Sequence, residues 1–203
     1  MAFEPMEPMS DPMGTLLREI SACTACAAHL PHGPRPVVVA GRVSRIVIIG
    51  QAPGRKVHAT GIPWNDPSGD NLRGWLGVDR AAFYDPTRFA LVPMGFCYPG
   101  TGRSGDLPPR PECAPLWHPR VFAAMGPVRL TLLVGRYAQQ RYLGDRAGKD
   151  LTTTVRGFRG HLPRYLPMPH PSPRNRLWLR RNPWFETELL PVLKEHVARL
   201  LHN

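Results

Sequence analysis

The feature that most constrains the fold is a short apolar run, Arg-Ile-Val-Ile-Ile-Gly, at residues 45–50. A β-branched run of this length that ends in glycine is typical of a strand buried on both faces of a parallel sheet. Comparable runs lie at residues 89–96, 130–135 and 165–169. Segments with helical patterns alternate with these runs. We therefore predict an α/β fold of three layers, in which helices cover both faces of a central four-stranded, mostly parallel sheet.

The remaining organisation follows from the segments around these strands. The predicted helices are 16–22, 68–76 with Ser68 as its N-terminal cap, 136–143 and 183–201, the last one amphipathic. Residues 1–14 are rich in proline, methionine and acidic residues, and we expect a flexible tail there. A chain of 203 residues suits a single core, so we predict one domain over residues 15–203.

The charge of the chain indicates a polyanionic partner. The formal net charge is +11, and most of the 26 basic residues are arginines, which grip phosphate in a bidentate fork. A codon bias of the genome explains arginine in place of lysine, but it does not explain the positive surplus. We therefore predict that the chain binds nucleic acid.

The sequence also predicts where the protein works. No stretch approaches the roughly 20 apolar residues of a membrane span. The N-terminus lacks the basic start and apolar centre of a secretory signal. We therefore expect a cytoplasmic protein with no membrane partner.

The cysteines form a close pair and two distant members. Cys23 and Cys26 make a Cys-x-x-Cys, and Cys97 and Cys113 follow far along the chain. Because cytosolic thiols stay reduced, this pattern favours a metal site, either zinc or a 4Fe-4S cluster, over disulfides. A redox Cys-x-x-Cys opens a helix after a strand, whereas a helix is expected before Cys23. Four unrelated buried cysteines are the remaining alternative.

Two loops at predicted strand ends carry candidate ligand-binding residues. Residues 50–54 read Gly-Gln-Ala-Pro-Gly, in which glycines let backbone amides approach a ligand closely. Residues 170–174 read His-Pro-Ser-Pro-Arg, in which a rigid turn follows a histidine. Because parallel strands end at one edge of the sheet, both loops should face the same crevice. Taken singly, each loop also fits an ordinary structural turn.

Together the two loops resemble the signature motifs of the uracil-DNA glycosylase superfamily, and the likeness extends along most of the chain. The cysteine spacing resembles that of the superfamily's iron–sulfur families, which implies a structural 4Fe-4S cluster on Cys23, Cys26, Cys97 and Cys113. The resemblance also implies the superfamily's fold. It further implies an enzyme, expected to be monomeric, that flips uracil or other deaminated bases out of DNA and hydrolyses the N-glycosidic bond.

The resemblance assigns roles by position. The residues expected to contact the substrate are Gly50, Gln51, Ala52, Trp64, Ser172 and Arg174. Trp64 would stack on uracil, although an ordinary packed aromatic fits the same position. His170 would donate a hydrogen bond to uracil O2 and stabilise the negative charge that develops on the departing base. Arg174 would lie against the DNA backbone.

The first motif departs from the superfamily's pattern. Many relatives carry a catalytic acid at the position of Gln51 or Ala52, and neither residue is acidic here. One iron–sulfur family instead has an aspartate in a later stretch, which residues 60–69 resemble, and Asp66 matches that aspartate. We therefore predict Asp66 and His170 as the catalytic residues, with Asp66 orienting the water or stabilising an oxocarbenium-like sugar.

Other departures leave alternatives open. Asp66 also fits a plain acid at a helix N-terminus, and Asp70 and His58 are the next catalytic candidates. Relatives place an asparagine that reads the uracil edge after Cys97, and none stands there in this chain, so base selectivity stays open. Residues 101–110, which include two arginines, are predicted to form a DNA-facing loop.

Two further functions fit the sequence. The first is a catalytically impaired iron–sulfur protein of the same fold that binds damaged or single-stranded DNA, which the absence of an acid at Gln51 and Ala52 favours. The second is an unrelated zinc-stapled α/β hydrolase acting on a nucleoside-like substrate. Zinc in a colourless protein would favour that hydrolase, whereas DNA binding without base release would favour the binding protein.

Overall fold

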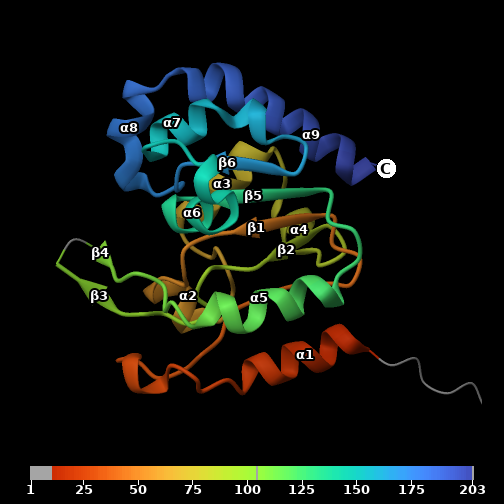
Figure 1. Ribbon diagram of the computed structural model, residues 1–203, viewed down its shortest axis with the longest axis vertical. Coiled ribbons are helices and arrows are strands. Elements are labelled where there is room, and N and C mark those ends of the chain that lie inside the picture. Colours follow the sequence, from red (N-terminus) through yellow and green to blue (C-terminus); the bar gives the residue numbers. More distant parts are fainter. Residues whose placement is uncertain (1–10, 104, 203) are drawn as a thin grey trace, which may run out of the picture.

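A parallel sheet forms the centre of the molecule, as predicted. The computed structural model describes residues 11–103 and 105–202 (Figure 1). The strands of the central sheet are β1 (Ile46–Ile49), β2 (Phe89–Leu91), β5 (Leu130–Val134) and β6 (Tyr165–Met168). They lie in the order β2-β1-β5-β6, and all neighbours are parallel. Every residue of these strands is buried, which explains why they read as continuous apolar runs.

Helices surround the sheet. The α-helices are α1 (Pro12–Ser21), α2 (Arg55–Thr60), α3 (Pro67–Leu76), α4 (Arg80–Tyr84), α5 (Cys113–Ala124), α6 (Arg136–Leu143), α7 (Leu151–Arg156), α8 (Arg176–Arg181) and α9 (Leu190–His202). Short helical turns are η1 (Ala27–His29), η2 (Gly144–Arg146), η3 (Phe158–His161), η4 (Pro173–Asn175) and the π-turn η5 (Phe185–Leu189). Within the described residues, no helix combines the length and apolarity needed to cross a membrane.

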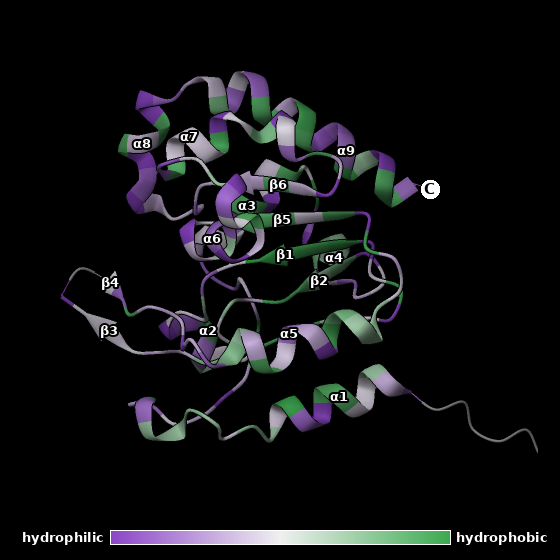
Figure 2. Ribbon diagram, viewed as in Figure 1, coloured by the Kyte–Doolittle hydropathy of each residue, from purple (hydrophilic) through white to green (hydrophobic). Residues whose placement is uncertain are grey.

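Two hydrophobic cores confirm the three layers. On one face of the sheet, alternate strand residues such as Val47 and Ile49 pack against α1, α5 and α6. On the other face, residues such as Ile46 and Ile48 pack against α3, α4, α7 and α9. Figure 2 shows β1 and most of β5 in the green of apolar residues, between these helices. The sheet is therefore held from both sides, and its strand ends are fixed in position.

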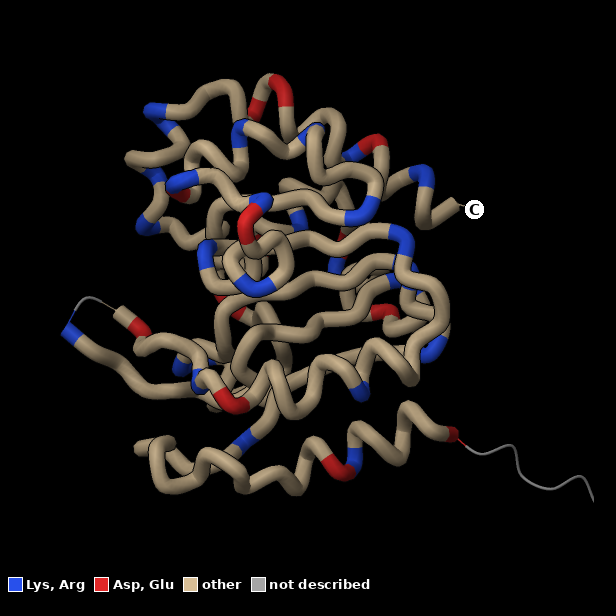
Figure 3. Tube along the Cα trace, in the orientation of Figure 1, with Lys and Arg blue, Asp and Glu red and all other residues tan. Residues whose placement is uncertain are grey.

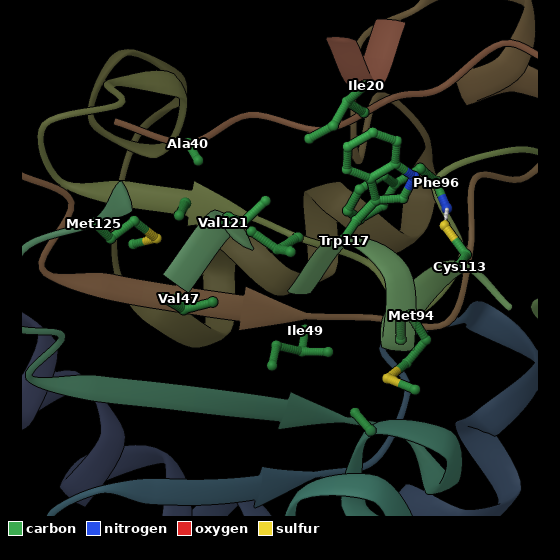
Figure 4. Packing of buried hydrophobic residues seen from close by; sticks show 14 of the residues in the cluster. Ile20, Ala40, Val47, Ile49, Met94, Phe96, Cys113, Trp117, Val121 and Met125 are labelled. Carbon is green, nitrogen blue, oxygen red and sulfur yellow. Dashed lines mark hydrogen bonds between the residues drawn. The ribbon is translucent and has the colours of Figure 1, made fainter. Parts of the chain in front are cut away.

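Helix α1 lies outside α5, at the margin of the molecule (Figure 1). Figure 4 shows Ile20 of α1 packed with Trp117 of α5 and Phe96, beside Cys113. An ion pair between Arg120 and Glu19 also joins the two helices. The N-terminal segment therefore attaches to the domain mainly through α5 and the cysteine region.

Several element boundaries differ from the predictions. Asp66, rather than Ser68, caps α3 by accepting a hydrogen bond from the Gly69 N–H. Strand β2 ends at Leu91, shortly before Pro93, which has no N–H to donate to a neighbouring strand. The predicted helix 183–201 is divided into η5 and α9.

The predicted tail and the predicted loop also contain regular structure. Residues 1–10 of the tail lie outside the described part of the chain, and Asp11 caps α1, which begins at Pro12. The segment 101–110, predicted as a loop, includes a two-stranded antiparallel hairpin of β3 (Thr101–Gly102) and β4 (Gly105–Asp106). In Figure 1 this hairpin and α8 stand on the side at which the strands of the central sheet end.

Candidate functional site

The turn after β1 forms the floor of a pocket. Residues 50–54 line it, and the carbonyls of Gly50 and Gln51 accept hydrogen bonds from the loop that follows β2. A Cβ added at Gly50 would stand 2.7 Å from Cζ2 of Trp64, so only glycine lets the indole lie this close to the strand end.

The backbone of Trp64 is in an unusual conformation. Its φ is 56°, a left-handed value that a bulky residue rarely adopts. The surroundings hold this conformation, because the Trp64 carbonyl accepts a hydrogen bond from Arg73 and lies where a Cβ on Gly69 would stand 1.7 Å away. The indole lines the pocket, and its ring centre is 5.7 Å from that of His170. Strained backbone of this kind concentrates at functional sites.

Asp66 serves two purposes at once. Its Oδ1 accepts a hydrogen bond of 2.8 Å from the Gly69 N–H and caps α3. The same side chain lines the pocket. The helix-capping interpretation and the pocket interpretation are therefore compatible, and a rigid helix end fixes the carboxylate.

His170 follows β6 and is held by its own loop. Its Nδ1 accepts a hydrogen bond of 3.2 Å from the Ser172 N–H, and its carbonyl accepts one of 2.7 Å from the Asn175 side chain. Burial lowers the pKa of His170, and the nearby Asp66 charge acts in the opposite direction. A neutral imidazole that accepts at Nδ1 carries its proton on Nε2, so His170 is a hydrogen-bond donor at Nε2.

The loop after His170 continues along the pocket. Ser172 Oγ accepts a hydrogen bond of 3.3 Å from the Arg174 N–H, which opens the turn η4. Asn71 of α3 donates to the Pro171 carbonyl over 2.8 Å and so ties this loop to the helix that Asp66 caps. The side chain of Arg174 extends toward the hairpin, where a Cβ on Gly105 would meet its Nη1 at 2.8 Å.

The structure brings all the predicted substrate and catalytic residues to one cavity of about 260 Å³. These residues are Gly50, Gln51, Ala52, Trp64, Asp66, His170, Ser172 and Arg174. They come from the ends of two strands and from the segment before α3. The two reserve candidates do not line it: Asp70 pairs with Arg73 over 2.5 Å, and His58 packs against His32 and Tyr98.

The sequence did not predict the second acidic residue of the pocket. Asp106, the last residue of β4, lines the cavity with the predicted set. Burial raises the pKa of its carboxyl, whereas the Arg174 guanidinium lowers it. The arginines of this segment predict a DNA-facing loop, but no pattern in the sequence distinguishes Asp106 as a pocket residue.

The cysteines line a second, separate cavity. Cys23, Cys26, Cys97 and Cys113 surround it together with apolar side chains. Cys113 accepts a hydrogen bond of 3.3 Å from the Phe96 N–H. Burial raises the pKa of Cys97 to about 11 and that of Cys113 to about 12, so both are thiols in the absence of a cation. Within residues 11–103 and 105–202, no group of three or more His, Cys, Asp or Glu side chains is arranged to hold a metal ion.

A comparison with protein families agrees with this geometry. The model of the family described as the Uracil DNA glycosylase superfamily matches residues 38–194. The matched region contains the central sheet, both pocket loops, the hairpin, and Cys97 and Cys113.

Proposed function

The chain belongs to the uracil DNA glycosylase superfamily, and on this premise we propose that it is a base-excision repair enzyme that removes uracil from DNA. Membership indicates glycosylase-type chemistry. The observation that carries the finer proposal is that Trp64 and Asp66, directly before α3, line one pocket with His170, which follows β6, at the carboxyl edge of the sheet. The enzyme would flip the uracil into this pocket and hydrolyse its N-glycosidic bond.

The role proposed for His170 follows from its tautomer. As the bond between C1′ and N1 breaks, its electron pair leaves with uracil, and negative charge develops at O2. The Nε2–H of a neutral His170 donates a hydrogen bond to that oxygen, and the Ser172 N–H on Nδ1 keeps the proton on the correct nitrogen. A donor aimed at charge that exists only in the transition state lowers the barrier.

The roles proposed for Trp64 and Asp66 follow from how each is held. Trp64 offers a flat ring against which a flat base can stack, and its backbone is locked by Arg73 and by the space at Gly69. Asp66 keeps one oxygen on the end of α3, and its carboxylate would stabilise the positive charge of an oxocarbenium-like sugar or orient the water.

The surface around the pocket supports DNA as the partner. Figure 3 shows basic residues along α8 and at the hairpin, on the side where the strands end. Arg176, Arg180 and Arg181 belong to α8, and Arg174 precedes it at the pocket itself. Guanidinium groups on both sides of the pocket would hold the phosphates beside a flipped nucleotide.

We also propose that the cysteine cavity holds a 4Fe-4S cluster with a structural role. Four thiolates are a donor set that suits zinc as well as a four-iron cluster, and all four cysteines line one cavity. The resemblance of their spacing to that of the iron–sulfur families favours the cluster. The cluster would bind α1 and the loop after β2 to α5.

The remaining proposals concern organisation. Free thiols that bind a cluster suit a reducing compartment, so we propose the cytoplasm as the location. We propose one domain that acts as a monomer and that includes α1 from Pro12, so it begins before the predicted boundary at residue 15. Size-exclusion chromatography with light scattering tests the monomer, and a mass near 22.7 kDa is the expected result.

A second candidate is a DNA-binding protein without catalysis. Gln51 and Ala52 favour it, because neither can act as the acid that many relatives carry in the first motif. Such a protein would bind DNA through the same basic surface and release no base.

One assay separates the two candidates. Labelled single- and double-stranded oligonucleotides, each with one uracil, hypoxanthine or xanthine, are incubated with the protein and then treated with alkali to break abasic sites. Cleavage at uracil supports the enzyme, and the panel gives its base preference. Binding without cleavage on every substrate supports the binding protein.

A further inference from the structure

Asp106 is an acidic residue beside the first motif, which has no acid of its own. It ends β4 and lines the pocket beside the turn that follows β1. A Cβ built on Gly54 would lie 3.3 Å from Asp106 Oδ2, so the carboxyl group rests against the backbone of the first motif. The residue as a whole is exposed, but this carboxyl group faces the pocket.

Gln51 fixes the strand that carries this carboxylate. Its Nε2 donates a hydrogen bond of 3.2 Å to the carbonyl of Leu107, the residue directly after Asp106. The Leu107 N–H in turn donates to the Gly100 carbonyl over 2.9 Å, which closes the hairpin stem. The side chain at the usual position of the acid is therefore engaged in holding a second segment against the pocket.

The charges around Asp106 suit a proton acceptor. Burial raises the pKa of the carboxyl, and Asp66 raises it further, while Arg174, a hydrogen bond from Thr101 and Arg55 act to lower it. The balance lies above the usual value of an exposed aspartate. A carboxylate with a raised pKa is a stronger base than an exposed one.

We propose that Asp106 is the general base of the reaction and that Gln51 is a positioning residue that holds it in the pocket. This inference rests on the proposed glycosylase activity. The water oxygen forms a bond with C1′ of the deoxyribose, and the Asp106 carboxylate takes the proton from that water. The bond between C1′ and N1 breaks, and its electron pair leaves on uracil, whose O2 accepts the hydrogen bond from His170.

The two pocket carboxylates then have different tasks. One oxygen of Asp66 is engaged with the Gly69 N–H, so Asp66 acts as a fixed negative charge beside the sugar. Asp106 has its carboxyl group at the end of a hairpin, with no helix end to cap. On this proposal Asp106, which lies against Gly54 of the first motif, takes the role of the acid that many relatives carry at residue 51 or 52.

The test measures single-turnover rates of uracil release across a range of pH. It compares the wild type with Asp106→Asn and with the double variant Gln51→Glu/Asp106→Asn. The control is Asp145→Asn, which changes an exposed aspartate of η2. We expect Asp106→Asn to lower the rate about 10²-fold with DNA affinity and melting temperature retained. The wild-type rate should rise with pH as Asp106 ionises. This rise in the pH–rate profile should be absent in Asp106→Asn. The double variant, which has a carboxylate at residue 51, should release uracil about tenfold faster than Asp106→Asn alone. The rate of Asp145→Asn should equal that of the wild type.

The outcomes are distinguishable. If the wild type releases uracil and Asp106→Asn has the same rate and the same pH dependence, the role of Asp106 is refuted and the proposed function stands. A variant that loses DNA affinity and rate equally makes Asp106 a binding residue and also overturns the proposal. A wild type that binds DNA but releases no base from any substrate refutes the proposed function and, with it, this inference.

Discussion

The pocket and the cysteine cavity differ in what holds their residues in place. The pocket loops leave buried strands β1 and β6, and nearby hydrogen bonds fix their side chains: Asp66 to a helix end and His170 to the Ser172 N–H. The cysteine cavity lies between the chain after α1, the loop after β2 and the start of α5, and burial raises the pKa of Cys97 and of Cys113. Hydrogen bonds within the protein thus organise the pocket, whereas we propose that a bound cluster further stabilises the cysteine cavity.

Removal of one cysteine should have the largest effect on the protein as a whole. In Cys113→Ala, we expect loss of iron and of visible absorbance, and a loss of several kcal/mol in unfolding free energy, because metal-binding energy becomes folding energy. The rate per folded molecule should stay close to that of the wild type. Iron analysis, absorbance and thermal melting measure these effects.

Thr24→Ser provides the control, since Thr24 is an exposed residue between the paired cysteines. It should keep the iron and the melting temperature. The comparison between the two regions fails if Cys113→Ala keeps its stability but loses catalysis.

Removal of His170 should lower the rate of catalysis and leave stability unchanged, the opposite of what is expected for Cys113→Ala. We expect His170→Ala to lower uracil release by about 10²- to 10³-fold, since a transition-state donor is lost, while DNA affinity and melting temperature change little. Single-turnover kinetics and a binding titration measure the two quantities. His202→Ala, on an exposed residue at the end of α9, is the control. Equal losses of rate and affinity would remove the catalytic role.

His118 connects the two regions. It belongs to α5, which begins at Cys113, and its Nε2–H donates over 3.0 Å to the carbonyl of Pro93, a pocket residue. Its Nδ1 accepts from the Tyr142 hydroxyl over 2.5 Å. Burial lowers the pKa of His118 from 6.5 to about 4. The bridge therefore depends on a neutral imidazole.

The stability of the protein should consequently depend on pH. Above pH 6.5 His118 is neutral in both the folded and the unfolded state, and it contributes no slope. As pH falls from 6.5 toward about 4, His118 is protonated in the unfolded state but not in the folded state. The free energy of unfolding therefore decreases, by about 3 kcal/mol at the end of this range. Urea unfolding at several pH values measures the slope. His118→Asn should have a shallower slope, and an equal slope would show that His118 is not the group responsible.

Asp66→Asn should give the smallest effect on the fold and a clear effect on the rate. Asparagine caps helices about as well as aspartate, so the melting temperature should change little. The rate of uracil release should fall by roughly tenfold or more, because the pocket loses a negative charge beside the sugar. An unchanged rate would leave Asp66 with its capping role alone.

The sequence predicted the pocket well because its residues follow strand ends. A buried strand is visible as an apolar run, and residues directly after it reach the same edge of the sheet, so Gly50 and His170 could be brought together without coordinates. Asp66 could be found only through the resemblance, because its approach to the pocket depends on the turn at Trp64, whose positive φ no propensity predicts.

The hairpin and the exact helix boundaries could not be predicted from the sequence. Strands β3 and β4 are two residues long and carry glycines, so they have no periodic pattern, and the position of Asp106 depends on docking through Gln51. The sequence predicts Ser68 as the cap of α3, since serine is a good capping residue, but Pro67 fits the first helical position and leaves Asp66 as the cap. Such choices depend on tertiary contacts rather than on local propensity.

The most direct test of the central claim is base excision by the purified, cluster-containing protein on a uracil oligonucleotide, with His170→Ala in parallel. We expect alkali-labile sites at uracil with the wild type and about 10²- to 10³-fold fewer per unit time with the variant. If the wild type binds the oligonucleotide and leaves every uracil in place, the pocket is a recognition site and the account of catalysis is wrong.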